Sequence, residues 1–554
     1  MSRRSIPHSA LDVYRIPHEG PGDLPTKAMV GSKAHNLMRM ARCGLPVPPG
    51  FVLGTGLCRA YLKRGAQALD GLEDVFEREL ADLGARTGRR FGDAKRPLLV
   101  SVRSGAPVSM PGMMETVLNV GLTKTTLRGL LRLTGNPRLA ADCHRRLVQQ
   151  FAEVVHGVAA KAFEDMLAAR LREEKLARVE ELDSRALNDL AAAYEEKFQA
   201  LVGEEFPSSP MSQLRASAEA VLKSWTSARA ESYRRLNGIS DEVGTATLVE
   251  TMVFGNAGPS SGSGVGFTRN PSDGSNKLYV DYLPNAQGED VVAGRRNALP
   301  LDELERRAPK AHQELLRARG VLEQEFGDMQ DFEFTLEEGC LYMLQARAGK
   351  RTPLATLRIA HDLVAEKTIA PEEGVKLLEG VDLDAIEVVE IAAAGVQPMA
   401  RGVPASGGVV VGTVVFDAGR VGEFTRQGKP VVLLRENTET ADIQALSQAQ
   451  ALVTAHGART SHAAVVARQL GKVCIVGCNA LNIDGGQRSG AFDAVAIKEG
   501  ELVTVDGTLG LIFRGELQVR RSKPERLVAA VRRWQAAGTR AKASKRSSAD
   551  EGRA

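Results

Sequence analysis

The residue pattern changes twice before residue 350 of this 554-residue chain. Up to about residue 122, short apolar runs such as residues 98–102 alternate with Gly and Pro, which is typical of strands and turns. From about residue 125 to 237, Ala, Leu, Arg and Glu dominate, and apolar residues recur at helical spacing. From residue 244 to about 347 the strand-like pattern returns. A helical block between two β-rich segments predicts a mixed α+β or α/β chain with several domains.

The rest of the chain contains three further segments. Residues 352–395 are predicted to form a helical connector, and residues 396–520 contain short strands typical of a separate domain. Residues 521–554 form a basic tail, with a short helix expected over residues 527–534. The predicted domains are residues 1–122, 123–240, 241–351, 352–395, 396–520 and 521–554.

The net charge of +4 is unevenly distributed. Residues 520–554 contain eleven Lys or Arg and three Asp or Glu, a net +8, so the rest of the chain carries −4. A mildly acidic body argues against nucleic-acid binding, and six Cys in such a chain do not indicate a disulfide framework. No apolar run reaches the ~18 residues of a membrane span, and the first residues lack the apolar core of a secretory signal. We therefore expect a cytoplasmic protein that binds neither membranes nor nucleic acid.

One strand-turn-helix pattern carries a histidine. The apolar run 449–454 leads into the small residues Gly457 and Ala458, and His462 then precedes a helical run of Ala and Val. A histidine at a helix N-terminus lies where the helix dipole and free amides favour an anion such as phosphate. The same surroundings lower the pKa of the imidazole, which keeps a nitrogen lone pair available for attack. The spacing alone is equally compatible with a histidine that merely caps a surface helix.

This segment resembles the phosphohistidine swivelling domain of phosphoenolpyruvate-utilising enzymes, and within that group the pyruvate, phosphate dikinase family. The similarity continues through residues 471–478 and 500–507. It implies that His462 carries the phosphoryl group and that Thr460 corresponds to a regulatory phosphorylation site of some members. The family's Gly-Gly-Met before the Thr-Ser-His motif ends here in Arg459, which adds a positive charge beside the site.

A second pattern places paired carboxylates on a strand. Asp331 and Glu333 are two residues apart, so both side chains point to one face, and hard oxygen ligands on one face suit Mg²⁺. Gln345 and Arg347 repeat this spacing on the expected partner strand. An exposed acidic edge strand paired with Arg347 is the alternative. The block 328–352 resembles the metal-binding end of the dikinase ATP-grasp domain, which implies that Asp331, Glu333 and Gln345 bind metal and that Arg347 contacts phosphate.

Further candidates lie in loops rich in Gly and Ser. Lys33 and Arg103 sit beside Gly or Ser, where the backbone could approach a phosphate; a lone Lys or Arg in a loop is usually just solvated. The resemblance places both at nucleotide-binding positions. It also implies that Gly262 and Gly264, in a Gly-rich loop, bind the nucleotide and that Glu289 is an additional carboxylate of the metal or phosphate site. A bare Gly-rich loop is a weak signal, because it also occurs in hairpins.

The resemblance covers about residues 25–520 and implies an ATP-grasp domain with a helical insertion, followed by a swivelling β/β/α phosphohistidine domain. In the family a TIM barrel that binds pyruvate and phosphoenolpyruvate follows, and such a barrel needs about 200–250 residues. Only 34 residues follow Arg520, so we expect the barrel to be absent and the chain alone not to make phosphoenolpyruvate.

The predicted function is that of a dikinase-like phosphotransferase. Mg²⁺ and ATP, with inorganic phosphate, would phosphorylate His462 and give AMP and pyrophosphate, while the connector lets the carrier swing. Two alternatives are a phosphotransferase with a different small acceptor and a phosphohistidine carrier or regulatory protein that acts on a partner. A separate acceptor-domain protein and a homodimer are left open.

Overall fold

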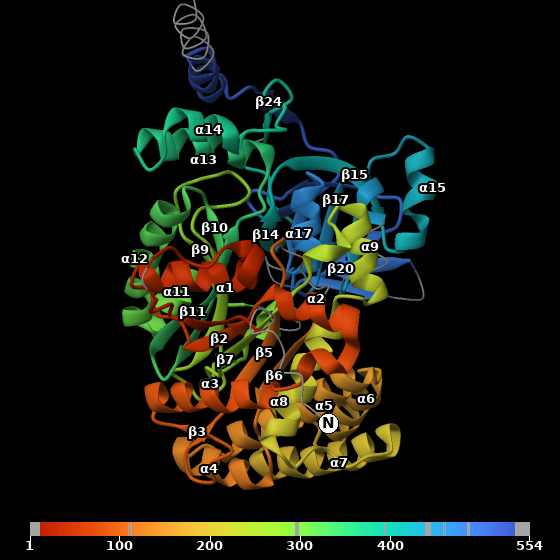
Figure 1. The fold of residues 1–554 in the computed structure, drawn as a ribbon. Helices are drawn as coiled ribbons and strands as arrows, with labels where there is room; N and C mark the ends of the chain where they lie inside the picture. Colours follow the sequence, from red (N-terminus) through yellow and green to blue (C-terminus); the bar gives the residue numbers. More distant parts are fainter. Residues whose placement is uncertain are drawn as a thin grey trace, which may run out of the picture. The chain divides into compact units, whose positions relative to one another are not determined.

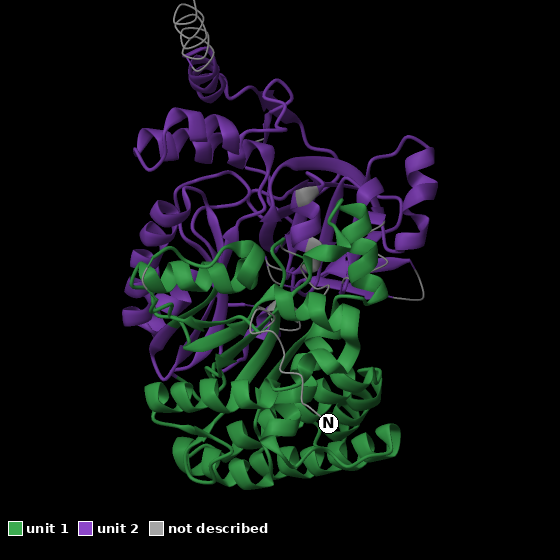
Figure 2. Cartoon of the chain, viewed as in Figure 1, with its two compact units in different colours: residues 1–259, 342–345 green, residues 260–341, 346–554 purple. Residues whose placement is uncertain are grey.

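The computed structural model describes most of the chain. The described residues are 11–20, 22–108, 110, 114–293, 298–392, 395–437, 445–457, 459, 461–484 and 488–537, with only the backbone described at 292, 293, 462, 463 and 469. The chain divides into two compact units (Figure 2): unit 1 comprises residues 1–259 with 342–345, and unit 2 comprises residues 260–341 with 346–554. The mixed α/β multidomain fold predicted from the sequence is confirmed.

Unit 1 is built on a five-stranded sheet in which all neighbouring strands are antiparallel. In sheet order the strands are β1 (Val13–Ile16), β2 (Gly50–Leu53), β7 (Ala246–Thr251), β5 (Val100–Gly105) and β6 (Thr116–Val120). Strand β7 lies between β2 and β5, although the helical block separates it from β6 along the chain. The helical block is therefore an insertion within the sheet domain.

The helices of unit 1 begin and end where local chemistry favours it. The helices and short strands are α1 (Lys27–Arg42), α2 (Thr55–Arg64), α3 (Leu72–Thr87), β3 (Arg90–Phe91), β4 (Pro97–Leu98), α4 (Lys124–Thr134), α5 (Pro137–His156), α6 (Lys161–Glu173), α7 (Ser184–Val202), α8 (Pro210–Ser224) and α9 (Ala228–Leu236). Polar side chains accept a backbone N–H at the start of α4, α5, α7, α8 and α9, which satisfies amides that the helix leaves unpaired. A glycine with positive φ ends α4, α5 and α7.

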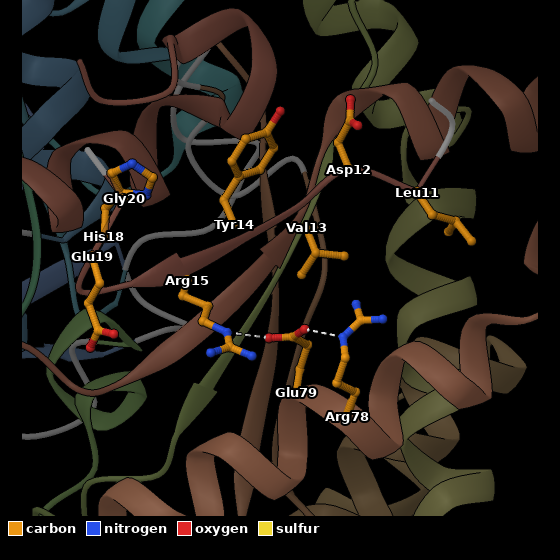
Figure 3. Close-up of a pocket in the computed structure, with 10 residues that line it drawn as sticks. All are labelled: Leu11, Asp12, Val13, Tyr14, Arg15, His18, Glu19, Gly20, Arg78 and Glu79. Atoms are coloured by element: carbon orange, nitrogen blue, oxygen red, sulfur yellow. Dashed lines mark hydrogen bonds and ion pairs between the residues drawn. The ribbon is translucent and has the colours of Figure 1, made fainter. Parts of the chain in front are cut away.

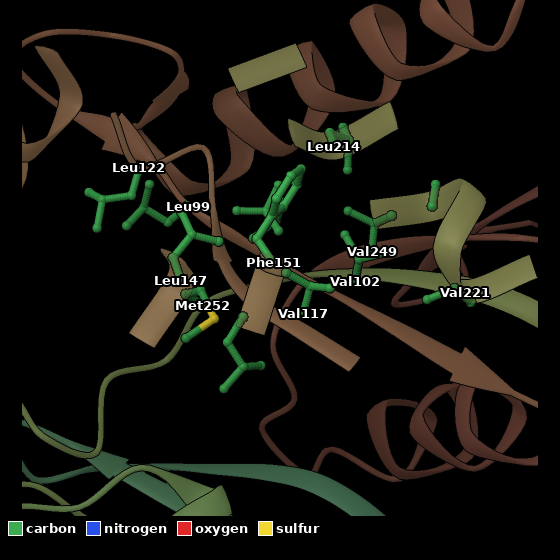
Figure 4. Packing of buried hydrophobic residues seen from close by; sticks show 14 of the residues in the cluster. Leu99, Val102, Val117, Leu122, Leu147, Phe151, Leu214, Val221, Val249 and Met252 are labelled. Atoms are coloured by element: carbon green, nitrogen blue, oxygen red, sulfur yellow. The ribbon is translucent and has the colours of Figure 1, made fainter. Parts of the chain in front are cut away.

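The core of unit 1 joins the sheet to the helical block. Leu147 and Phe151 of α5 pack with Val102 and Val249 of the sheet (Figure 4), and all four side chains are buried. Burial of a large apolar side chain stabilises a fold by about 1.5–3 kcal/mol. The helical spacing of these residues in the sequence therefore marks the buried face of α5.

The first part of unit 2 is a four-stranded sheet. Its strands, in sheet order, are β11 (Cys340–Ala348), β10 (Gln330–Glu337), β8 (Gly262–Phe267) and β9 (Tyr279–Pro284). The predicted strand pair around residues 337–340 is confirmed as the β10–β11 hairpin. Three helices follow β9: α10 (Gly288–Ala293), α11 (Leu301–Arg307) and α12 (Pro309–Phe326).

The connector contains helices α13 (Pro353–Ala365) and α14 (Pro371–Leu377) and strand β12 (Val388–Ile391). Strand β12 pairs with β24 (Val519–Ser522), so the boundary predicted at residue 520 falls inside a strand. A helix over residues 525–537 follows. Its Val531 is fully buried against Leu357 and Leu378 of the connector. The first part of the basic tail is therefore packed against the connector.

The last domain has three layers (Figure 1). Its eight-stranded sheet has the order β13 (Ala400–Arg401), β23 (Leu511–Arg514), β22 (Leu502–Asp506), β15 (Val409–Val415), β16 (Val431–Arg435), β17 (Ala451–Thr454), β18 (Val473–Val476) and β14 (Val403–Ser406). Helices α15 (Val421–Arg426) and α17 (His462–Gln469) pack on one face. A three-stranded sheet of β19 (Leu481–Asp484), β20 (Ser489–Phe492) and β21 (Val495–Lys498) packs on the other. This arrangement is the predicted β/β/α domain. Every helix in the part of the chain that the structure describes is too short or too polar to cross a bilayer.

Candidate functional site

One face of the four-stranded sheet in unit 2 carries acidic side chains. Directly opposite residues of neighbouring strands point to the same side, as do residues two apart along one strand. The strand register places two rows on this face: Asp331–Phe267–Tyr279 and Glu333–Val265–Asp281. We call this side of the sheet the carboxylate face, after Asp331, Glu333 and Asp281.

The two oxygens of Asp331 have different surroundings. Oδ2 accepts a hydrogen bond from Nε of Arg347 at 2.9 Å, whereas Oδ1 is buried and has no hydrogen-bond partner. Burial raises the pKa of the Asp331 carboxyl, and the charge of Arg347 opposes that shift. A buried carboxylate oxygen without a partner fits a ligand of a bound cation. The predicted metal role of Asp331 therefore has a physical basis in this structure.

Other predicted metal ligands lie on or near the same face. Glu333 is half-buried on β10, and Glu289 is on α10, whose Val291 packs against Val265 of the face. Gln345 lies on β11 two residues before Arg347, within the stretch grouped with unit 1. Among the described residues, no three His, Cys, Asp or Glu side chains converge closely enough to hold a metal by themselves. Mg²⁺ usually takes one or two carboxylates together with phosphate oxygens, so a carboxylate pair fits it.

The structure places Gly262 and Gly264, which are predicted to bind the nucleotide, in a strand. Both residues are in strand β8 rather than in a loop, and they lie on the face opposite to the carboxylates. A Cβ atom on Gly264 would be 2.3 Å from the ring of Phe334, and one on Gly262 would be 2.3 Å from the hydroxyl of Tyr282. These glycines make room for aromatic rings of the neighbouring strands. The period-two spacing of the glycines matches this strand, and their nucleotide-binding role stays a prediction.

Lys33 and Arg103 lie on adjoining segments of unit 1. Helix α1 is interrupted at Gly31, whose φ of 77° favours glycine. The next residue, Ser32, donates its backbone N–H to the carbonyl oxygen of Ala106 at 2.9 Å, which places Lys33 beside the end of the strand that carries Arg103. Arg103 is 3.8 Å from the buried carboxylate of Glu250. Two cations next to close backbone contacts are an arrangement suited to a phosphate.

His462 is the first residue of helix α17, as predicted from the sequence. Ser461 caps the helix by accepting the N–H of Ala464 at 3.4 Å. The helix connects the parallel strands β17 and β18, so the preceding loop leaves the carboxyl end of β17, where α/β sheets commonly bind ligands. The side chain of His462 and the whole of Thr460 lie outside the described residues.

The loop that leads to His462 contacts the carboxylate face within unit 2. The backbone N–H of Arg459 donates to Oδ2 of Asp281 at 2.9 Å, and its guanidinium lies 3.9 Å from the ring centre of Tyr279. Arg468 of α17 is buried and donates to the carbonyl oxygens of Ala405 and Arg459 at 2.7 and 2.9 Å. Sequence reasoning missed Tyr279, Asp281 and Arg468. For Asp281 and Arg468, the available signal was a charged residue inside an otherwise apolar strand or helix.

A pocket of about 420 Å³ in unit 1 is separate from all these residues (Figure 3). It is lined by residues 11–15, 18–20, 78 and 79. Its two arginines, Arg15 and Arg78, each bond to Glu79 at 2.8 Å. Since both cations are already paired with this carboxylate, the pocket does not resemble an anion site.

Two families of protein domains match the chain. The pyruvate phosphate dikinase AMP/ATP-binding domain matches residues 70–301, and the mobile domain of PEP-utilising enzymes matches residues 427–510. The second match contains α17 and the loop before it.

Similar proteins are pyruvate, phosphate dikinases. The chain is 40% identical over 501 residues to the enzyme from Clostridium symbiosum, covering 90% of this chain and 57% of that protein. It is 41% identical over 499 residues to pyruvate, phosphate dikinase 1, chloroplastic, from Arabidopsis thaliana, covering 89% of this chain and 52% of that protein. The enzyme from Rhizobium meliloti is 39% identical over 520 residues, with 90% and 57% covered. The chain thus spans about half the length of these relatives. Over that half the chain is similar to pyruvate, phosphate dikinases, and its matches to the AMP/ATP-binding domain and to the mobile domain follow one another in this order.

Proposed function

We propose that the chain is a dikinase-type phosphotransferase that uses ATP and inorganic phosphate to phosphorylate His462. The observation that carries this proposal is the contact between the loop preceding His462 and the sheet face that holds Asp331 and Glu333. A carrier histidine must come within bonding distance of the phosphoryl group, and metal ligands must lie beside that group. One face of one sheet supports both requirements.

In this proposal each predicted residue has a charge-based role. Lys33, Arg103 and Arg347 neutralise the phosphates, while Asp331, Glu333, Gln345 and Glu289 hold Mg²⁺. The metal ion would supply positive charge next to the phosphate oxygens. Arg347 already lies on β11 against Asp331, which keeps its guanidinium beside the carboxylate face. Such preorganised charges supply most of the rate enhancement in phosphoryl transfer.

The chemistry at His462 balances in two steps. A neutral ring nitrogen attacks the β-phosphorus of ATP, and the bond to the α-phosphate oxygen breaks, so that AMP leaves. Inorganic phosphate then takes the γ-phosphoryl group as pyrophosphate, and the β-phosphoryl group stays on His462. The N-terminal position on α17 supports the proposal, because the helix dipole and free amides there favour an anion such as a phosphoryl group.

The final acceptor is proposed from the relatives' printed name, which is pyruvate, phosphate dikinase. We propose that the acceptor is pyruvate. It would be bound either by a region that corresponds to the unmatched half of the relatives or by a separate protein. A different small acceptor and a phosphocarrier role on a partner are the alternatives. The homodimer, the domain boundaries, the regulatory role of Thr460 and the cytoplasmic location stay predictions; the relatives include a chloroplastic protein as well as bacterial ones.

The test is labelling with Mg-ATP that carries radioactive β-phosphate, in the presence of inorganic phosphate. The wild-type chain should form an acid-labile, base-stable phosphoprotein, and His462→Ala should lose the label while still binding ATP. The matched control is His456→Ala, which removes an exposed histidine from the same loop and should keep the label. Equal labelling of His462→Ala and wild type contradicts the proposal.

Isotope exchange separates the proposed enzyme from the carrier alternative. A dikinase half-reaction is reversible, so label should move from AMP into ATP when pyrophosphate is present. A regulatory phosphocarrier phosphorylated by another enzyme shows no such exchange. Omission of inorganic phosphate should stop net formation of AMP with pyrophosphate, which distinguishes dikinase from simple kinase chemistry.

A further inference from the structure

We propose that Arg459 is a positioning residue that fastens the loop before His462 to the carboxylate face through Asp281 and Tyr279. We call these three residues the latch. This inference rests on the proposed function of His462 and adds the residues that hold the histidine at the site of phosphorylation.

The first part of the latch is the pairing of Arg459 with Asp281. Oδ2 of Asp281 accepts the backbone N–H of Arg459 at 2.9 Å, and Oδ1 lies 3.5 Å from its Nε. Asp281 is 5% exposed. Burial raises the pKa of its carboxyl, and Arg459 opposes the shift. A buried carboxylate needs such a partner, because an ionised group without one is costly to bury.

The second part is the ring of Tyr279. The Arg459 guanidinium lies 3.9 Å from the ring centre, well within the ~6 Å over which a cation attracts an aromatic face. The Tyr279 hydroxyl donates to the carbonyl oxygen of Pro404 on β14. The hydroxyl of Tyr279 therefore bonds to β14, and its ring stacks on Arg459 in the loop before His462. Together these two contacts fix the direction of the loop as well as its distance from the carboxylate face.

The distance from the latch to the carboxylates of β10 is one that the loop between Arg459 and His462 can span. Asp281 is on β9, and Glu333 is two strands away on β10 in the same row, so their Cα atoms are about 10 Å apart at the usual strand spacing. Arg459 precedes His462 by three residues, which reach at most about 10 Å when extended. The span of the loop therefore equals the distance from Asp281 to Glu333, so a loop held at Asp281 lets His462 reach the carboxylates that we assign to the metal.

Arg459 is distinct from Arg468 in what it holds. Arg468 donates to Ala405 and to Arg459, both in the last domain, and its guanidinium lies 5.1 Å from the ring centre of Phe267 on the carboxylate face, so it supports the loop from the side of α17. Arg459 reaches across to residues of the four-stranded sheet. Loss of the Arg459 side chain should therefore leave the last domain folded and remove the contacts of its guanidinium with Asp281 and Tyr279, while the backbone N–H of residue 459 and the Tyr279–Pro404 bond remain.

The test uses the full chain with Arg459→Met, Asp281→Ala and the double variant. The control is Arg401→Met, which removes an exposed arginine from β13 of the same domain. Two quantities are measured: the single-turnover rate of His462 labelling from Mg-ATP, and the ATP dissociation constant by equilibrium dialysis. We expect each single variant to label at least tenfold more slowly with an ATP affinity within twofold of wild type. The double variant should label at most about twofold more slowly than the slower of the two single variants, because the effects of substitutions at coupled partners are not additive. Arg459→Lys, which keeps the charge but not the planar group, should recover part of the rate.

A second measurement does not depend on turnover. Hydrogen exchange of the Arg459 amide should be slow in wild type and in Arg401→Met, because that amide is bonded to Asp281, and fast in Asp281→Ala. Wild-type labelling rates in Arg459→Met, or equal exchange in wild type and Asp281→Ala, would overturn the latch. Protected exchange without any labelling of wild-type His462 would instead contradict the proposed function and leave the latch standing.

Discussion

At the scale of single residues, the two oxygens of the buried Asp331 carboxylate differ in their hydrogen bonding. One oxygen is satisfied by Arg347, and the other is left without a partner. Its spacing from Glu333 was sufficient to predict a shared face, because alternation along a strand is a local property. The partner Arg347 was also predictable, since a hairpin brings it opposite.

The first prediction concerns these carboxylates. Asp331→Asn and Glu333→Gln should each reduce His462 labelling by about 10²–10³-fold, because charge beside the transferring group is lost while side-chain shape is kept. The control is Glu338→Gln, which removes the same charge from the exposed turn of the same hairpin and should label normally. Normal labelling by Asp331→Asn would mean that the metal is bound elsewhere.

The glycines of β8 give a second prediction. Gly264→Ala places a methyl group where the Phe334 ring lies, so unit 2 should lose about 1–3 kcal/mol of stability through overpacking. Gly320→Ala in α12, where nothing lies within 4 Å of the added carbon, should be neutral or stabilising. Urea unfolding measures both. A Gly264→Ala protein of normal stability with weakened ATP binding would instead support the predicted nucleotide-binding role of this residue.

Other residues could not be placed from the sequence, for physical reasons. The contact of Arg459 with Asp281 joins residues far apart in the chain, and no local pattern encodes such a pair. Trp225 and Leu236 are both apolar residues of the helical block, yet Leu236 is 85% exposed and Trp225 is 1% exposed. Leu236 is the last residue of α9, and hydrophobicity alone does not tell where a helix leaves the core.

At the scale of elements, the apolar periodicity of the sequence predicts the presence of a helix better than it predicts the residues at which the helix begins and ends. Helix α1 begins at Lys27, and it is broken at Gly31 by a positive φ that the apolar spacing does not reveal. The connector was expected to be free to swing, but α13 is anchored. Arg269, fully buried, bonds to Glu323 of α12 at 2.8 Å and to Glu366 at the end of α13 at 2.6 Å. Any bending is therefore expected after α14.

Helix α5 gives the third prediction, on pH. Its buried Asp142 pairs with Arg145 at 2.8 Å and with Arg146 at 2.9 Å. Burial acts to raise the pKa of Asp142, but the two arginines outweigh it and hold the pKa well below its ordinary value of 3.8. A depressed folded-state pKa contributes stability that is present above the unfolded pKa and is lost as pH falls below about 4 toward the folded pKa.

Asp142→Asn should remove this acid dependence and destabilise unit 1 by about 3–5 kcal/mol at neutral pH, because both arginines lose the buried negative charge that they bond to. Unfolding free energies of wild type and variant between pH 2 and 7 measure the effect. The difference between the two proteins should shrink as pH falls. The exposed pair Lys161–Asp165, 3.0 Å apart on α6, provides the control: Asp165→Asn should change stability by less than about 1 kcal/mol. A constant difference for Asp142→Asn at all pH values would refute the argument.

At the scale of the whole molecule, charge on the basic tail is less available than its composition suggests. The sequence gives residues 520–554 a net +8, which could steer an acidic partner. In the part that the structure describes, Arg520 pairs with Glu390 at 2.8 Å, Arg521 with Glu387 at 3.0 Å and Arg532 with Asp384 at 2.5 Å. Neutralisation by the connector weakens that steering hypothesis and suggests packing as the role of the helix over residues 525–537.

The last prediction decides between packing and charge. Val531→Asp puts a carboxylate among Leu357, Leu378 and Ile386 and should destabilise unit 2 by several kcal/mol, because an unpaired charge is costly to bury. Arg533→Asp changes the net charge twice as much at an exposed position of the same helix and should leave the stability within about 0.5 kcal/mol. Thermal unfolding compares the variants with wild type. The last domain is joined to the connector through the β12–β24 pair next to this helix, so loosening the helix should also slow His462 labelling. The opposite result would be that Arg533→Asp slows His462 labelling more than Val531→Asp does, and that this effect is larger at low salt than at high salt. The tail would then act through its electrostatic field and not through its packing.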